Sequence, residues 1–156
     1  MVDAKVHIRW TIKRDMPEVM RIENECFTHC PWSEEDWQRC LCNRSNISMV
    51  AEVEECVVGV MVYELQTQSL RVLNFAVRDD WQRLGIGSVM IGKLKSKLSH
   101  ERRKRITLHV RESNLVAQQF FRSQGFRALG ICRDVYEDTN EDAYLFQYRL
   151  PVCEGK

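Results

Sequence analysis

The sequence lacks long apolar runs, an excess of either charge and any repeated or low-complexity segment. Because no run of eighteen apolar residues occurs, no helix that crosses a bilayer is predicted. Residues 1–10 carry Asp3, Lys5, His7 and Arg9 where a signal peptide has an apolar stretch. Lys and Arg total 23 against 22 acidic residues, which gives no reason to expect direct binding to nucleic acid or to a membrane. We therefore expect a cytoplasmic protein.

Cysteine is plentiful but odd in number, at seven. Without an apolar leader, paired disulfides are not expected and reduced thiols are predicted. Cys26, Cys30, Cys40 and Cys42, with His29 nearby, have the number and type of ligands for tetrahedral zinc. Cysteines spaced in this way on amphipathic helices more often face a core, so we predict small buried side chains and no metal.

The length of 156 residues suits one hydrophobic core, and we predict a single domain over 1–156 with a flexible tail at 151–156. Apolar periodicity and turn residues mark the expected elements. Strands are predicted at 6–11, 47–53, 57–65, 71–77, 106–110, 126–132 and 143–150, and helices at 15–26, 33–42, 88–98 and from Asn114. This order favours an α/β fold with a twisted, mostly antiparallel sheet of about seven strands and helices on both faces.

Two glycines, Gly85 and Gly87, lie where the strand pattern of 71–77 gives way to the helical pattern of 88–98. Glycine permits positive φ and close approach of a ligand to the backbone, while the first N–H groups and the dipole of a helix attract an anion. We predict that the anion is a pyrophosphate. Neither a Walker loop nor a dinucleotide fingerprint fits, because the residues after Gly87 supply neither Lys-Ser/Thr nor a third glycine.

A second segment, 108–126, predicts a strand followed by a helix that begins at Asn114 and ends at a left-handed glycine cap, Gly125. Its Val-Arg-Glu-Ser-Asn-Leu-Val-Ala run and its Gly-Phe end, together with Gln-Arg-Leu-Gly-Ile-Gly at 82–87, resemble the two signatures of the GNAT acetyltransferase superfamily. The resemblance implies an acetyl-coenzyme A-dependent N-acetyltransferase of the GNAT fold. It also implies a V-shaped gap between the central strands, in which pantetheine lies like an extra strand.

The same resemblance implies which residues hold acetyl-coenzyme A. The backbone at the end of the 71–77 strand would bind pantetheine, and its N–H groups, above all that of Val77, would meet the oxyanion. The loop at 82–88 would bind the pyrophosphate. The cofactor-binding residues expected in this way are Phe75, Ala76, Val77, Gln82, Arg83, Leu84, Gly85, Ile86, Gly87, Ser88, Asn114, Ala117 and Phe121.

Two segments nearer the ends of the chain, at 31–37 and at 133–143, are similar to the RimI-type branch, whose members acetylate protein amino termini. This likeness implies a peptide acceptor, such as a ribosomal protein that begins with alanine, held by Trp32 and Tyr136. The acids Glu137, Asp138, Glu141 and Asp142 would attract an ammonium group. A polyamine or an aminosugar would suit the same charge, which leaves a small-amine acetyltransferase as the alternative.

His109 is the predicted base, because its ordinary pKa near 6.5 lets it accept a proton at neutral pH. Strand alternation places Leu108 and Val110 on one face and His109 on the other. Many relatives carry a tyrosine acid where this chain has Phe121, which cannot donate a proton. Either Tyr136 or, as we favour, solvent would then protonate the leaving thiolate. The missing acid also allows a second alternative, a noncatalytic acyl-coenzyme A sensor.

Overall fold

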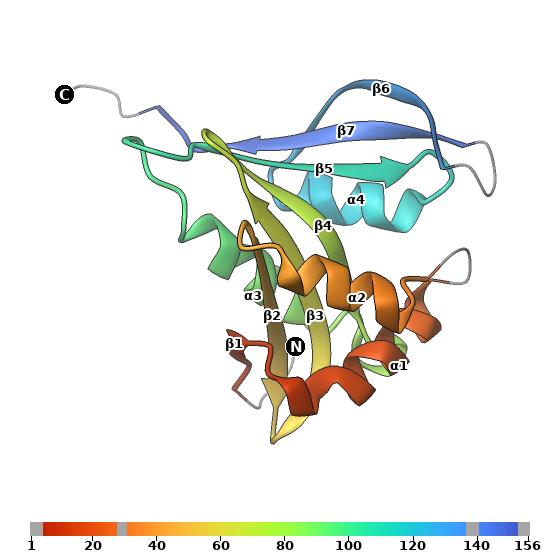
Figure 1. Cartoon of the computed structure of the whole chain (residues 1–156). Helices are drawn as coiled ribbons and strands as arrows, with labels where there is room; N and C mark the ends of the chain where they lie inside the picture. Colours follow the sequence, from red (N-terminus) through yellow and green to blue (C-terminus); the bar gives the residue numbers. More distant parts are fainter. Residues whose placement is uncertain (1–4, 28–30, 137–140, 153–156) are drawn as a thin grey trace. The chain divides into compact units, whose positions relative to one another are not determined.

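The computed structural model describes residues 5–27, 31–136 and 141–152, with the backbone alone at 134–136. Its elements follow the predicted order (Figure 1). They are β1 (His7–Trp10), a 3-10 turn η1 (Lys13–Asp15), α1 (Met16–Cys26), α2 (Glu34–Cys42), β2 (Asn46–Val53), β3 (Cys56–Leu65), β4 (Ser69–Val77), η2 (Asp79–Trp81), α3 (Ile86–Lys95), β5 (Arg105–Arg111), α4 (Leu115–Ser123), β6 (Arg127–Tyr136) and β7 (Glu141–Arg149). The sequence placed α3 two to three residues too late and ended β6 too early, at Cys132.

The strands form one mixed, seven-stranded sheet in the order β1-β2-β3-β4-β5-β7-β6, which confirms the predicted α/β fold. The pairs β1/β2, β2/β3, β5/β7 and β6/β7 are antiparallel. Strands β4 and β5 run parallel and pair Ser69–Arg71 with Arg105–Thr107. The V-shaped gap stays a prediction. No helix in the described part of the chain is both long and apolar enough to cross a membrane.

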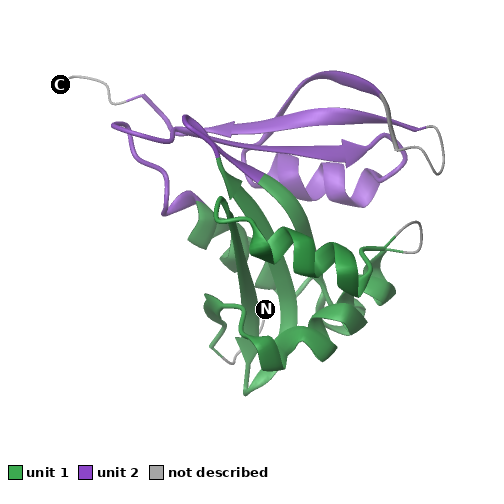
Figure 2. Cartoon of the chain, in the orientation of Figure 1, with its two compact units in different colours: residues 1–65, 72–94 green, residues 66–71, 95–156 purple. Residues whose placement is uncertain are grey.

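Two compact units divide the chain (Figure 2). Unit 1 comprises residues 1–65 and 72–94, and unit 2 comprises residues 66–71 and 95–156. Strand β4 contributes to both units, with its first three residues in unit 2. A single domain over 1–156 stays a prediction, and the units are described separately below.

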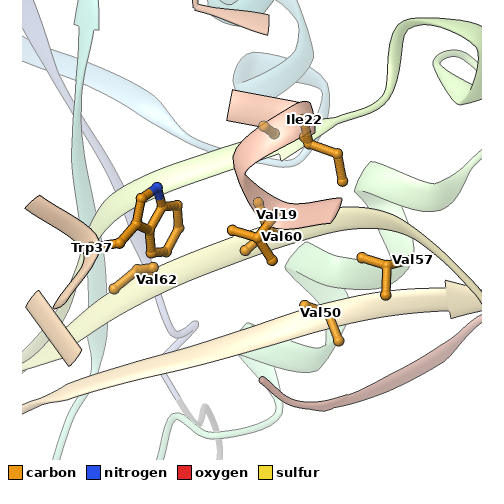
Figure 3. Packing of buried hydrophobic residues seen from close by; sticks show 8 residues of the cluster. Val19, Ile22, Trp37, Val50, Val57, Val60 and Val62 are labelled. Carbon is orange, nitrogen blue, oxygen red and sulfur yellow. The ribbon is translucent and has the colours of Figure 1, made fainter. Parts of the chain in front are cut away.

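Unit 1 has its core where α1 and α2 pack on β2 and β3 (Figure 3). Val19 and Ile22 of α1 and Trp37 of α2 are fully buried against a set of strand residues. That set is Val50, Val57, Val60, Val62 and Ala76. Strand alternation turns the intervening residues to the other face, where α3 packs. A Cβ on Gly59 would lie 3.0 Å from the Met90 sulfur of α3 and 3.2 Å from the Ala76 oxygen, so glycine permits this close approach.

Unit 2 packs α4 on one face of β5 and β7. The buried Leu108 of β5 pairs with Phe146 of β7, and the Arg122 guanidinium of α4 lies 5.4 Å from the centre of the Phe146 ring. The helix ends in a Schellman motif: Phe126 N–H donates to the Phe121 oxygen, Gly125 N–H donates to the Arg122 oxygen, and Gly125 has φ +90°. This confirms the predicted left-handed cap at Gly125.

A buried carboxylate, Glu23 of α1, joins three segments of unit 1. It is 1% exposed and accepts a hydrogen bond from Trp32 N–H at 2.8 Å and another from Asn74 Nδ2 at 2.7 Å. Burial raises the pKa of Glu23, and the two hydrogen bonds oppose that rise without cancelling it. In the described part of the chain the buried Asn74 Oδ1 has no hydrogen-bond partner, so a flipped amide could accept a hydrogen bond from the protonated carboxyl of Glu23.

We predict that Glu23→Gln removes part of the pH dependence of stability. In the wild type the folded carboxyl holds its proton above the ordinary pKa of 4.5, so Glu23 makes the free energy of unfolding fall as pH rises from 4.5 through the folded pKa. Glutamine cannot titrate, so the difference between variant and wild type should grow in the variant's favour across that window. Urea unfolding at a series of pH values measures this difference.

The control is Glu25→Gln, which removes one charge from the exposed side of the same helix. It should leave the slope of the unfolding free energy against pH close to that of the wild type. A slope in Glu23→Gln that matches the wild type would contradict the raised pKa.

Candidate active site

The glycine loop of unit 1 has the backbone of an anion cradle. Gly85 has φ +91° and Arg83 has φ +63°, and left-handed residues in such turns direct successive N–H groups into one concavity. Helix α3 begins directly afterwards at Ile86, and the N–H groups of a first helical turn have no acceptor within the helix. Apart from its two chain neighbours, no described residue has an atom within 4 Å of a Cβ built on Gly85, which leaves the approach to this backbone open.

Only one of the two glycines lies in the turn that the sequence predicted. The tight turn with positive φ is at Gly85, as predicted, whereas Gly87 lies within α3 as its second residue. The second left-handed position is Arg83, an exposed residue. Arginine has no preference for this backbone conformation, so the sequence did not predict it. The chemistry and geometry of residues 83–88 therefore fit a phosphate group.

The residues before the loop are held by side chains of unit 1. The Val77 oxygen accepts hydrogen bonds from the Cys26 thiol at 3.1 Å and from Gln82 Nε2 at 2.9 Å. Gln82 Nε2 also lies 3.2 Å from Asp79 Oδ1. The Gln82 side chain thus orders the turn, and its predicted contact with the cofactor stays a prediction, as do those of Phe75, Ala76, Leu84 and Ser88.

The predicted cofactor residues of unit 2 have structural tasks in α4. Asn114 caps the helix through Oδ1, which accepts Ala117 N–H at 3.1 Å, as the sequence predicted. Phe121 is 4% exposed and packs edge to face on Phe120 and Phe126, with ring centres 5.0 and 5.3 Å away. Phe121 is therefore part of the core of unit 2.

The candidate base, His109, lies on the face of β5 that α4 does not cover. Leu108 and Val110 are buried and His109 is half-buried, which confirms the predicted alternation. Burial first, and then the positive charge of Arg71 on β4, lower the pKa of His109 from its ordinary 6.5. The imidazole is therefore neutral at neutral pH and able to accept a proton. His109 Nε2 lies 3.4 Å from the Cys132 sulfur of β6, a contact that the sequence did not reveal.

The predicted acceptor residues lie in both units. In unit 1 the half-buried Trp32 packs edge to face on Trp37, with ring centres 4.8 Å apart. In unit 2 the backbone of Tyr136 pairs with that of Glu141, and the Tyr136 side chain lies outside the described part. Glu141 accepts the Ser113 hydroxyl at 2.7 Å. Of the other predicted acids, Asp142 forms an ion pair with Arg133, while Glu137 and Asp138 lie outside the described residues.

The cysteines are partly used for hydrogen bonding. Besides the Cys26 contact, the Cys40 sulfur accepts Asn46 Nδ2 at 3.3 Å. Cys42 is exposed, so the prediction that it faces a core is wrong: it is the last residue of α2 and lies beyond the buried stripe set by Trp37. Cys30 and His29 lie outside the described residues, and among the described ones no three potential ligands are grouped to hold a metal.

A family of known enzymes matches this arrangement. The acetyltransferase (GNAT) family model matches residues 16–126, from α1 through the glycine loop to the cap of α4. The chain belongs to the GNAT family. It is accordingly an N-acetyltransferase, and acetyl-coenzyme A is the acetyl donor that this family uses.

Individual relatives cover almost the whole chain. An uncharacterized N-acetyltransferase of Methanocaldococcus jannaschii is 28% identical over 149 residues, which is 95% of this chain and 94% of the relative. The ribosomal protein bS18-alanine N-acetyltransferase of Escherichia coli is 28% identical over 141 residues, 88% of this chain and 92% of the relative.

Solved structures agree on the fold. The crystal structure of the ribosomal-protein-S18-alanine N-acetyltransferase from Escherichia coli has a TM-score of 0.83 at 23% identity, covering 97% of this chain and 99% of that one. Ard1 from Thermoplasma volcanium has a TM-score of 0.83 at 25% identity, covering 94% and 99%.

We predict that Gly85→Ala weakens both folding and binding of acetyl-coenzyme A. A side chain at a left-handed position costs roughly 1–2 kcal/mol of folding free energy. The matched control is Gly92→Ala on the exposed side of α3, with open space around its Cβ, which should stabilise the fold by about 0.5–1 kcal/mol. Urea unfolding and calorimetric titration with acetyl-coenzyme A measure the two effects. Equal stability of the two variants would contradict the assigned turn.

We also predict that Arg71→Gln moves the acid limb of the pH profile of kcat/KM to higher pH. Removing the positive charge lets His109 hold its proton more tightly, so the fraction of free base falls at each acidic pH. Steady-state rates across the pH range measure the shift. The control for loss of a cation is Arg105→Gln, at the start of β5 and four residues before His109. An unmoved acid limb would contradict the interaction between Arg71 and His109.

Proposed function

We propose that the protein transfers the acetyl group of acetyl-coenzyme A to the amino terminus of a protein. The observation that carries the proposal is the half-buried His109, kept neutral by burial and by Arg71. Similarity to bS18-alanine N-acetyltransferases at 28% identity supports a protein acceptor, and we propose a ribosomal protein with an amino-terminal alanine.

The weak base favours an α-amine over an aliphatic amine. An α-amino group has a pKa of about 7.7–8.0, whereas a lysine-like amine has one near 10.4. A base whose own pKa lies below 6.5 takes a proton from the former at far less free-energy cost. A polyamine, the small-amine alternative, is thus the poorer match to His109.

The bound donor supplies an acyl group already activated as a thioester. In the proposal, N–H groups of residues 83–88 hold its pyrophosphate, with the Arg83 guanidinium as a further donor. The backbone of Phe75, Ala76 and Val77 aligns the pantetheine arm, and Val77 N–H stabilises the oxyanion. His109 accepts the proton of the attacking amine, directly or through water.

The departing thiolate obtains its proton from solvent in this proposal. Phe121 has no proton to give and is packed between two aromatic rings. A thiol with a pKa near 8.5 is a tolerable leaving group in water, so the reaction proceeds without a dedicated acid. Trp32 and Tyr136 are proposed to line the path of the acceptor peptide.

The test is a thiol-release assay with acetyl-coenzyme A and peptides that begin with Ala, Ser or Met, alongside spermidine. We expect turnover on peptides, weak turnover on spermidine, and a loss of about 100-fold or more in kcat/KM in His109→Ala, as for other general bases. His100→Ala, in an exposed turn, is the control for loss of a histidine.

The outcomes separate the alternatives. Peptide turnover that survives His109→Ala would keep the function and discard the base. Turnover on spermidine alone would replace the protein acceptor with a small amine. Binding of acetyl-coenzyme A without turnover on any amine would favour the acyl-coenzyme A sensor.

A further inference from the structure

We propose that Cys132 is a positioning residue for His109: its sulfur accepts the Nε2–H of the ring and so leaves Nδ1 as the nitrogen that takes the proton of the acceptor amine. The inference rests on the proposed function, in which His109 is the base. It assigns a task to a cysteine that no sequence pattern singled out.

The sheet register of unit 2 brings the two side chains together across an intervening strand. His109 of β5 pairs with Leu145 of β7, which in turn pairs with Gly130 of β6. Gly130 has no side chain to offer, and the next residue of β6 on the same face is Cys132, which pairs with Ala143. Because the β7 residue beside Cys132 is alanine, its small side chain leaves room for the Cys132 sulfur to lie 3.4 Å from His109 Nε2.

This face is the one that α4 leaves uncovered. Leu108 and Val110 turn toward the helix, so His109 and its neighbours across the strands turn away from it. Around the imidazole, β4 contributes the cation Arg71, β5 contributes Arg111 two residues along the same face, and β6 contributes the Cys132 thiol. The β7 residues between them, Ala143 and Leu145, carry no charge.

The position of the ring proton decides the direction of the hydrogen bond between His109 and Cys132. A neutral imidazole has one nitrogen that donates and one that accepts. If the thiol donated to Nε2, the ring proton would sit on Nδ1 and no lone pair would remain for the amine. For His109 to serve as a base, Nε2 must therefore carry the ring proton and donate a hydrogen bond to the Cys132 sulfur.

A thiol also suits this position better than a carboxylate would. A carboxylate beside an imidazole favours the charged ring and raises its pKa. A thiol hydrogen bond can fix the ring without a carboxylate, which is compatible with a histidine whose pKa is lowered by burial and by Arg71. Cys132 thus orients the base and leaves its proton affinity low.

The first test reads the tautomer directly, without any need for activity. Long-range ¹H–¹⁵N correlation spectra of the labelled protein distinguish protonated from bare ring nitrogens, and His109→Gln identifies the His109 signals among the four histidines. Above the pKa of the ring, we expect protonated Nε2 in the wild type and a mixture of tautomers in Cys132→Ala. Protonated Nδ1 in the wild type would overturn the proposal.

The second test is kinetic. Loss of one neutral hydrogen bond corresponds to about a two- to tenfold fall, which we expect in kcat/KM for Cys132→Ala with little change in stability. Cys132→Ser, which keeps an acceptor, should restore most of the rate, and the exposed Cys56→Ala should match the wild type. A Ser variant as slow as Ala, or an Ala variant as fast as wild type, would overturn the positioning role.

The two readouts keep this inference distinct from the function on which it rests. If protonated Nε2 depends on Cys132 but no amine is acetylated, the proposed function fails and the contact stands. If peptides are acetylated through His109 but the tautomer of His109 is the same in the wild type and in Cys132→Ala, the function stands and the inference fails.

Discussion

The buried carboxylate of Glu23 is the interaction on which the arrangement of unit 1 depends. It fixes Trp32, just before α2, and Asn74, just before the strand end proposed to hold pantetheine. Three residues along α1, the Cys26 thiol donates to the Val77 oxygen. Helix α1 therefore holds β4 on both sides of Phe75 and Ala76. Because the carboxylate has lost most of its water, each of its two hydrogen bonds is costly to remove, and the segment is rigid where alignment matters.

In unit 2 the candidate base His109 is positioned by strand alternation, and no buried charge among the described residues is involved. One face of β5 packs under α4, and the opposite face is left to polar residues that include His109. The side chain opposite His109 on the next strand is Leu145, so a partner for the imidazole must come from one strand further. Gly130 and Ala143 leave room for that partner, and Cys132 occupies the place. Burial and the positive charge of Arg71 lower the pKa of the ring.

Local chemistry explains which features could be predicted from the sequence. The caps at Asn114 and Gly125, the turn at Gly85 and the faces of Leu108 and His109 each follow from one residue type in one short pattern. The left-handed Arg83 and the exposed Cys42 did not, because backbone strain and the end of a buried stripe depend on neighbours. The contacts of Glu23 with Asn74 and of His109 with Cys132 were also missed. Each joins residues on different elements, which no local spacing encodes.

In the proposed function, the base His109 is weak, because its pKa is lowered, and Phe121 cannot act as an acid. At neutral pH roughly one α-amine in ten is already uncharged, given a pKa of about 7.7–8.0, so the base has little to do. The leaving thiol, with a pKa near 8.5, needs little help to depart. An aliphatic amine would need a stronger base, because its neutral fraction at the same pH is more than a hundredfold smaller. A site with a low-pKa histidine and phenylalanine at the place of the acid is therefore adequate for an α-amine and poorly equipped for a lysine-like one. In the proposed function, the chemistry of His109 and Phe121 therefore favours an α-amine as the acceptor.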